Sequence, residues 1–255
     1  MSCKYYPLDV EWKTRFLPLL KRPEVISVKR IIIQRIISTF RNDKNRKVWC
    51  QLPKKLIDKF LALNDEKLAE KIDTLAWGKF TVCEKLDDKD ADSVAQHRYW
   101  KECGKDPYND PTTLGHYLLV GEHVYIALLI WTLCKLAWPD KTWLIVNNSD
   151  HAFVMEEGDT ETIYDIILML FPVPAGMISL VNVKTYKNPL DATVPILGLN
   201  PNKSRAELET ELLDDWEKNL SMGMDESASH ERYKHRLKHE IPFTIAIKSA
   251  FSWNR

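Results

Sequence analysis

The feature that most constrains the fold is one nearly continuous apolar stretch, Val124 to Cys134. A helix of about 11 residues is about 16 Å long, roughly half of the hydrocarbon thickness of a bilayer. The stretch is therefore too short to cross a membrane and is typical of a helix buried in a protein core. We expect this helix to extend from His116 to about Leu136.

Strand patterns follow the apolar helix directly. Residues Lys141–Val146 are rich in β-branched and aromatic side chains, and a polar turn at 147–150 separates them from a second strand, His151–Glu156. After another short turn, Thr160–Ile167 is a third strand candidate. Strands joined by short polar turns pair with their sequence neighbours. The sequence thus predicts a buried helix packed on an antiparallel meander.

Helical patterns dominate the N-terminal part of the chain. Residues 24–40 place apolar side chains at helical spacing, with polar residues between them. Residues 53–76 predict two short amphipathic helices around Asn64, which is expected to cap the second one.

Towards the C-terminus the pattern is first irregular and then helical. Residues 171–202 contain five prolines, which favours strand ends and irregular connections. Helical spacing resumes at Lys203, with Ser204 as a cap, and continues to Glu240. We therefore expect an α+β protein with an N-terminal helical subdomain (1–100), an α+β core (101–202) and a C-terminal helical segment (203–255).

Composition excludes several classes of protein. The 36 basic residues equal the 36 acidic ones, which argues against an overall basic nucleic-acid binder. Only eight glycines are present, without a GxGxxG or P-loop motif, so no nucleotide cofactor is expected. The five scattered cysteines and the charged N-terminal residues favour a soluble intracellular protein, cytoplasmic or nuclear, without a disulfide framework or an export signal.

One segment is locally basic. Residues 21–47 contain nine Lys and Arg against two acidic residues. One interpretation is a helix that contacts an anionic surface. The other is a half-buried helix with a solvated, charged face, and the ordinary behaviour of such charge runs favours it.

A histidine and an acid occupy related positions in the expected meander. His151 begins one strand and Asp165 lies near the end of the next, a spacing that can place the two side by side across an antiparallel pair. A carboxylate beside an imidazole orients it for proton transfer, as in Cys-His-Asp sites. Asp159 in the turn is the competing acid, and a purely structural role for His151 is the alternative.

These residues carry a resemblance to a known superfamily. An apolar helix, a strand, the sequence SDHAF around His151 and a strand ending in Tyr164-Asp165 resemble the His-Asp half of transglutaminase-like and papain-like cysteine enzymes. Within that superfamily, residues 115–220 most resemble the menin family, including the segment ILGLNP at 196–201 and the acidic helix after it. The resemblance implies a transglutaminase-like core.

The chain departs from the enzymes of this superfamily at the nucleophile. Such enzymes carry cysteine at the start of the central helix, where the helix dipole lowers the thiol pKa. Residues 114–125 contain no cysteine, and Cys134 lies near the far end of the expected helix. Menin-like proteins also lack the nucleophile, so the resemblance implies a non-catalytic protein that binds a protein or peptide partner. The alternative is an acyl-transfer enzyme (protease, deamidase or transglutaminase) with Cys103 as nucleophile, His151 as base and Asp165 as orienting acid.

The remaining histidines point to no metal site. His116 and His123 are seven residues apart and could share a helix face. His235 and His239 have a spacing that can bind zinc, but no third ligand accompanies them in a recognisable motif. We therefore expect them on a solvated polar helix, with no bound metal.

Overall fold

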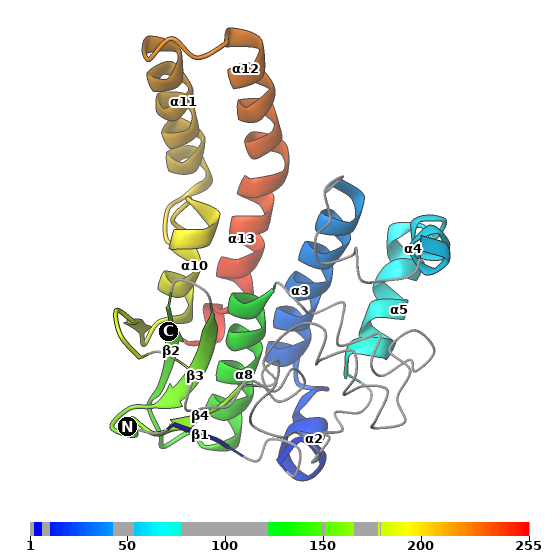
Figure 1. The fold of residues 1–255 in the computed structure, drawn as a ribbon, viewed down its shortest axis with the longest axis vertical. Coiled ribbons are helices and arrows are strands. Elements are labelled where there is room, and N and C mark those ends of the chain that lie inside the picture. The colour runs from blue at the N-terminus through cyan, green and yellow to red at the C-terminus, as the bar shows by residue number, and fades with distance from the viewer. Residues whose placement is uncertain are drawn as a thin grey trace. The chain divides into compact units, whose positions relative to one another are not determined.

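The computed structural model of the chain describes residues 3–6, 11–42, 54–77, 122–148, 151–165, 178 and 180–254. The chain divides into two compact units, Met1–Lys187 and Asn188–Arg255. Its described elements are helices, a three-stranded antiparallel sheet and a two-stranded parallel sheet, so the expected α+β class is confirmed (Figure 1). The division into parts at residues 100 and 202 stays a prediction.

The helices of the first unit follow the apolar patterns of the sequence. Among the residues that the structure describes, they are a π-helical turn Trp12–Phe16, α2 Leu17–Leu19, α3 Pro23–Asn42, α4 Lys54–Leu61, α5 Asp65–Trp77 and α8 His123–Ala137. In α3 the side chains of Val25, Val28, Ile32 and Ile36 are buried, which confirms the amphipathic helix expected there. Asn64 caps α5, because its Oδ1 accepts a hydrogen bond from the backbone N–H of Lys67 at 2.9 Å.

Helix α8 is the centre of the first unit. All of its side chains from Val124 to Cys134 are buried, and it packs against α3 and against strands β2 (Trp143–Asn147) and β3 (Ala152–Glu156). A helix that is apolar all round needs such cover on several sides. Its expected start at His116 is wrong: the backbone of Glu122, with φ −102° and ψ 34°, is not helical, so the helix begins at His123.

The sheet confirms the expected meander over the described residues. Strand β2 pairs antiparallel with β3 and with β5 (Lys184–Tyr186), giving the order β3-β2-β5. An antiparallel bridge from Val154 to Tyr164 links β3 to β4 (Thr162–Ile163), which pairs in parallel with β1 (Lys4–Tyr5). The third strand is shorter than the expected Thr160–Ile167, and the last two of those residues lie outside the described ones.

Tryptophans connect α8 to the sheet. The indole N–H of Trp131 on α8 donates to the backbone carbonyl of Trp143 on β2 at 3.0 Å. The ring of Trp143 in turn lies 5.6 Å from Trp138 and 4.9 Å from Tyr164, centroid to centroid. Because both packing and a hydrogen bond hold these rings, they fix the position of α8 relative to the sheet.

The second unit is a set of helices with its own core. They are α10 Pro189–Leu197, α11 Arg205–Ser221, α12 Glu226–His235 and α13 Ile241–Ala250, with a π-helical turn Arg236–Glu240 between the last two and a short 3₁₀ turn Ser252–Asn254. Leu199, Leu208, Leu212 and Ile241 form a buried cluster. The expected cap at Ser204 is confirmed, as part of a capping box with Glu207.

Helix α10 corrects the expectation that residues 171–202 are mainly irregular. Asn188 caps it by accepting from the N–H of Leu190, and Pro189 occupies the first turn, where a missing N–H costs nothing. Gly198 ends it with φ +61°, a left-handed conformation that glycine adopts without strain. Prolines in this segment therefore start a helix as well as interrupting one.

Three of the four basic residues of α3 are paired with acidic residues. Ion pairs join Lys29 to Asp73 (2.7 Å), Arg35 to Glu122 (3.6 Å) and Arg41 to Asp65 (3.1 Å). These pairs support the interpretation of a half-buried helix, and contact of residues 21–47 with an anionic surface stays a prediction. Over the described part of the chain, no helix combines the length and apolar character needed to span a membrane.

Candidate functional site

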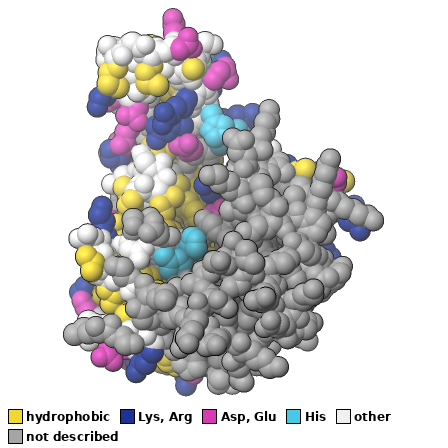
Figure 2. All heavy atoms as spheres, viewed as in Figure 1, with side chains coloured by type: hydrophobic (Ala, Val, Ile, Leu, Met, Phe, Trp, Pro, Cys, Tyr) yellow, Lys and Arg dark blue, Asp and Glu magenta, His cyan; other side chains and the backbone are white. Residues whose placement is uncertain are grey.

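His151 is placed by the turn that joins β2 to β3. Its backbone N–H donates to Oδ1 of Asn148 at 2.6 Å, and the N–H of Asn148 donates to the carbonyl of His151 at 2.9 Å. This reciprocal pair fixes the histidine immediately before β3. The side chain of His151 is 11% exposed. Histidine side chains reach the surface on the face shown in Figure 2, next to hydrophobic ones.

Asp165 is placed by the bridge between β3 and β4. Val154 and Tyr164 exchange backbone hydrogen bonds of 3.1 and 2.8 Å. In that register Asp165 lies opposite Phe153, and His151 is on the same face two residues away, because side chains alternate along a strand. Nε2–H of His151 donates to Oδ2 of Asp165, whose side chain is 3% exposed. The structure thus brings together two of the three predicted site residues.

The competing acid, Asp159, does not contact His151. Its Oδ1 accepts from the backbone N–H groups of Thr162 at 2.9 Å and Glu161 at 2.8 Å. Hydrogen bonds from Thr162 and Glu161 lower the pKa of Asp159. Asp159 is therefore a turn-forming residue, while Asp165 is the partner of the imidazole.

A third residue, His123, joins this pair and was not assigned to the site from the sequence. It is the first residue of α8, and its ring centroid lies 4.5 Å from that of His151, with the planes at 77°. Nδ1 of His123 is buried and has no hydrogen-bond partner among the described residues. Burial, and then the neighbouring His151, lower the pKa of His123 from 6.5 to about 4 against the opposing effect of Asp165. His123 is therefore neutral at pH 7.

The only sequence signal for His123 was its place beside the apolar stretch. Glu122 and His123 directly precede Val124, where that stretch begins. The prediction extended the helix seven residues further back and paired His123 with His116, which lies outside the described residues.

An ion pair ties the start of α8 to α3. The carboxylate of Glu122, the residue before His123, lies 3.6 Å from Nε of Arg35. The guanidinium of Arg35 also lies 5.9 Å from the ring centroid of Tyr125. Burial raises the pKa of Tyr125 to about 12. A carboxylate at a helix N-terminus is favourable, because the helix dipole is positive there.

The cysteines divide into those that the structure describes and those that it does not. Cys103, the candidate nucleophile, lies outside the described residues, so its place relative to His151 stays a prediction. Cys134 is fully buried in the last turns of α8, about 16 Å along the helix from its first residue. Burial raises the pKa of the Cys134 thiol well above its ordinary value, which makes it an inert core residue.

The second histidine pair is a surface feature. The rings of His235 and His239 lie 4.9 Å apart, centroid to centroid, and both residues are exposed. Within the described ranges, no group of three or more His, Cys, Asp or Glu side chains is arranged to hold a metal ion.

Together, His123, His151 and Asp165 have the groups that a proton-transfer site needs. A carboxylate holds one nitrogen of His151, which leaves the other nitrogen to act as a base. The uncharged imidazole of His123 packs against the ring of His151. No family model, no curated protein and no solved structure matches this chain.

Proposed function

We propose that this protein is a menin-like, non-catalytic interaction protein built on a degenerate transglutaminase-like core. The observation that carries the proposal is the identity of His123. In cysteine enzymes of that superfamily, the first turn of the helix that faces the His-Asp pair supplies the thiol. Here that position, beside His151 and Asp165, holds an imidazole. The orienting pair, with an imidazole instead of a thiol at the start of the helix, supports a site that has kept the arrangement of its residues and lost its nucleophile.

The partner is a protein or a peptide, bound at the degenerate cleft around His123 and at the aromatic-rich helical surfaces. The half-buried His123 and the partly exposed His151 offer donors and acceptors at such a cleft. Buried polar groups without partners favour a ligand that supplies hydrogen bonds to them. We place the protein inside the cell, because its five cysteines are scattered along the sequence and do not have the spacing of a disulfide framework.

Alkylation by iodoacetamide at pH 6 tests the loss of the nucleophile. In His123→Cys, the new thiol lies at a helix N-terminus beside His151, so it should be alkylated rapidly. Adding His151→Ala to that variant should slow the alkylation at least ten-fold. His230→Ala, a histidine in the second unit, is the matched control and should change nothing. If iodoacetamide alkylates the thiol of His123→Cys no faster than an ordinary cysteine, residue 123 does not correspond to the nucleophile position of the cysteine enzymes.

A capture experiment with the whole chain tests the interaction. His123→Trp should fill the cleft and abolish capture of any protein that the wild-type chain retains from a cell extract. His230→Ala should leave capture unchanged, and thermal denaturation checks that each variant is folded. Capture that is equal for the wild type and His123→Trp contradicts binding at the cleft.

The alternative function is a cysteine-dependent acyl-transfer enzyme with Cys103 as nucleophile. The observation that favours it is the hydrogen bond between His151 and the buried Asp165, which orients the imidazole as a general base requires. In this case Cys103 of the wild-type protein is alkylated rapidly at pH 6, and His151→Ala abolishes that reaction. Slow alkylation of Cys103 that does not depend on His151 excludes this alternative.

A further inference from the structure

Helices α11 and α12 form a hairpin whose far end, residues 213–235, has no apolar core of its own. In this range Ser229 is the only buried residue, and every other residue is at least partly exposed. The buried leucines of the hairpin, Leu208 and Leu212, lie earlier in α11. Helices in proteins owe most of their stability to the packing of an apolar face. The far end of the hairpin therefore lacks the cover that the start of α11 has.

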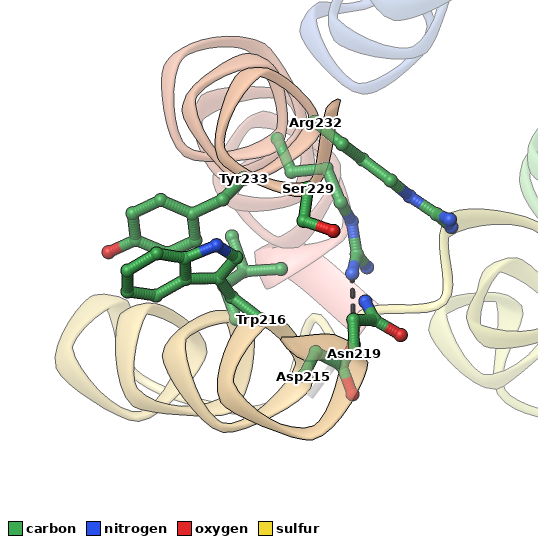
Figure 3. A pocket seen from close by; sticks show the side chains of 8 residues that line it. Asp215, Trp216, Asn219, Ser229, Arg232 and Tyr233 are labelled. Carbon is green, nitrogen blue, oxygen red and sulfur yellow. Dashed lines mark hydrogen bonds and ion pairs between the residues drawn. The ribbon is translucent and has the colours of Figure 1, made fainter. Parts of the chain in front are cut away.

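Apolar side chains nevertheless gather on one face of this end. Leu213, Trp216 and Leu220 are three and four residues apart on α11, so they share one side of the helix. The ring of Trp216 stacks on that of Tyr233 of α12, 5.6 Å between centroids, and the two rings lie on the side of the hairpin away from Arg232 (Figure 3). We call these four residues the aromatic face: Leu213, Trp216, Leu220 and Tyr233.

Two methionines add exposed apolar surface at the turn between the helices. Met222 is 63% exposed and Met224 is 46% exposed, while Leu213 of the aromatic face is 38% exposed. Figure 2 shows hydrophobic side chains at the surface of this end of the hairpin, among charged ones. Apolar side chains that gather in one place, with polar residues around them, are typical of an interaction surface.

The two helices of the hairpin differ in charge. Helix α11 has six acidic residues against two basic ones, whereas residues 226–240 have four Lys or Arg and three His against three Glu. Directly after the two stacked rings come Glu217 on α11 and Lys234 on α12, and both are exposed. Among the described residues Glu217 has no ion pair, and Lys234 pairs only with Glu231 of its own helix, at 3.7 Å. The aromatic face is thus bordered by an acid on one helix and a base on the other.

From these observations we propose that the aromatic face binds a second copy of this chain. Around a two-fold axis, α11 of each copy faces α12 of the other, and the two hairpins form a four-helix bundle. Glu217 of each copy then lies opposite Lys234 of the other, as charged residues do beside the seam of a coiled coil. One of the two helices would repel a partner of uniform charge, so the mixed border favours an identical copy. This surface is separate from the cleft at His123 and does not depend on the function proposed for that cleft.

Sedimentation velocity of the full chain over a range of concentrations tests this proposal. The wild-type chain should form a dimer as its concentration rises. Glu217→Lys should weaken the dimer about ten-fold, because it places like charges opposite one another at two symmetric positions. Lys234→Glu should weaken it for the same reason. Lys218→Glu is the matched control, because this exposed residue is turned about 100° further around α11, and it should dimerise as the wild type does.

A mixture of the two variants separates contact between copies from an effect within one chain. When Glu217→Lys and Lys234→Glu are mixed, each facing pair again has opposite charges, so a dimer with one copy of each variant should form. A defect within one chain would persist in the mixture. Circular dichroism checks that every variant is folded. A wild-type chain that stays monomeric, a dimer that Glu217→Lys leaves unchanged, or a mixture that stays monomeric overturns the proposal.

Discussion

At the scale of single residues, the chemistry of the site depends on the protonation of two neighbouring imidazoles, those of His123 and His151. His151 donates to a buried carboxylate, whereas Nδ1 of His123 has no hydrogen-bond partner among the described residues. Two imidazoles 4.5 Å apart cannot both take up a proton without repulsion. Burial, and then the neighbouring His151, lower the pKa of His123 to about 4, so His123 stays neutral at pH 7.

The low pKa of His123 makes a prediction about stability. The unfolded state binds a proton at His123 near pH 6.5, and the folded state only near pH 4. Neutral His123 therefore contributes stability above pH 6.5 that is lost as the pH falls to about 4, up to about 3 kcal/mol. In urea unfolding at several pH values, His123→Leu should show a smaller loss of unfolding free energy over this range than the wild type. An equal loss in both proteins would mean that His123 is not held neutral.

Asp165 gives a second prediction at this scale. Asp165→Asn keeps the shape of the side chain and removes the charge that His151 contacts. Hydrogen bonds to charged groups contribute about 1.5–3 kcal/mol, so the unfolding free energy should fall by about that amount. Asp159→Asn, in the neighbouring turn, is the control for a carboxylate that does not contact His151. The ¹⁵N shifts of the His151 ring should change in Asp165→Asn and stay as they are in Asp159→Asn.

At the scale of elements, the residue at which a helix begins decides which side chains its first turn places in a site or a cap. The first residue of α8 is part of the candidate site, and α11 begins at a complete capping box in which Ser204 and Glu207 each accept from the backbone N–H of the other. Exact starts matter because a shift of one residue turns a side chain by about 100° around the helix.

Ser204→Ala should destabilise α11. Loss of the cap costs about 0.5–2 kcal/mol, because the N–H of Glu207 loses its acceptor. Amide hydrogen exchange should become faster in the first turn of α11. Ser221→Ala, at the other end of the same helix, should change the unfolding free energy by less than about 0.5 kcal/mol. Equal effects of the two substitutions would show that the capping box adds no stability.

At the scale of the whole molecule, the two compact units each have a core of their own. The first is organised around α8 and the sheet, and the second around the cluster that includes Leu208 and Leu212. Leu212→Ala removes a side chain that is 2% exposed, so we expect a loss of about 2–5 kcal/mol. Hydrogen exchange should accelerate mainly in α11, α12 and α13. Acceleration of the same size in α8 and β2 would contradict separate cores.

Several features could be predicted from the sequence because they depend on local patterns. The stretch Val124–Cys134 is apolar on every side, so it had to be buried. The caps at Asn64 and Ser204 follow from side chains that reach their own backbone. The contact of His151 with Asp165 follows from the alternation of side chains along paired strands, once the short turns fixed the pairing.

Other features were decided only by the tertiary structure, because they depend on residues far apart in the sequence. The start of α8 at His123 and the pairing of Glu122 with Arg35 bring together two helices, and no local pattern encodes that meeting. The stacking of Trp216 on Tyr233 likewise needs α11 and α12 side by side. The sequence by itself determined the frame of helix and meander. Packing determined that the imidazole of His123 faces the His-Asp pair, since burial and neighbours, not composition, set the position and charge of His123.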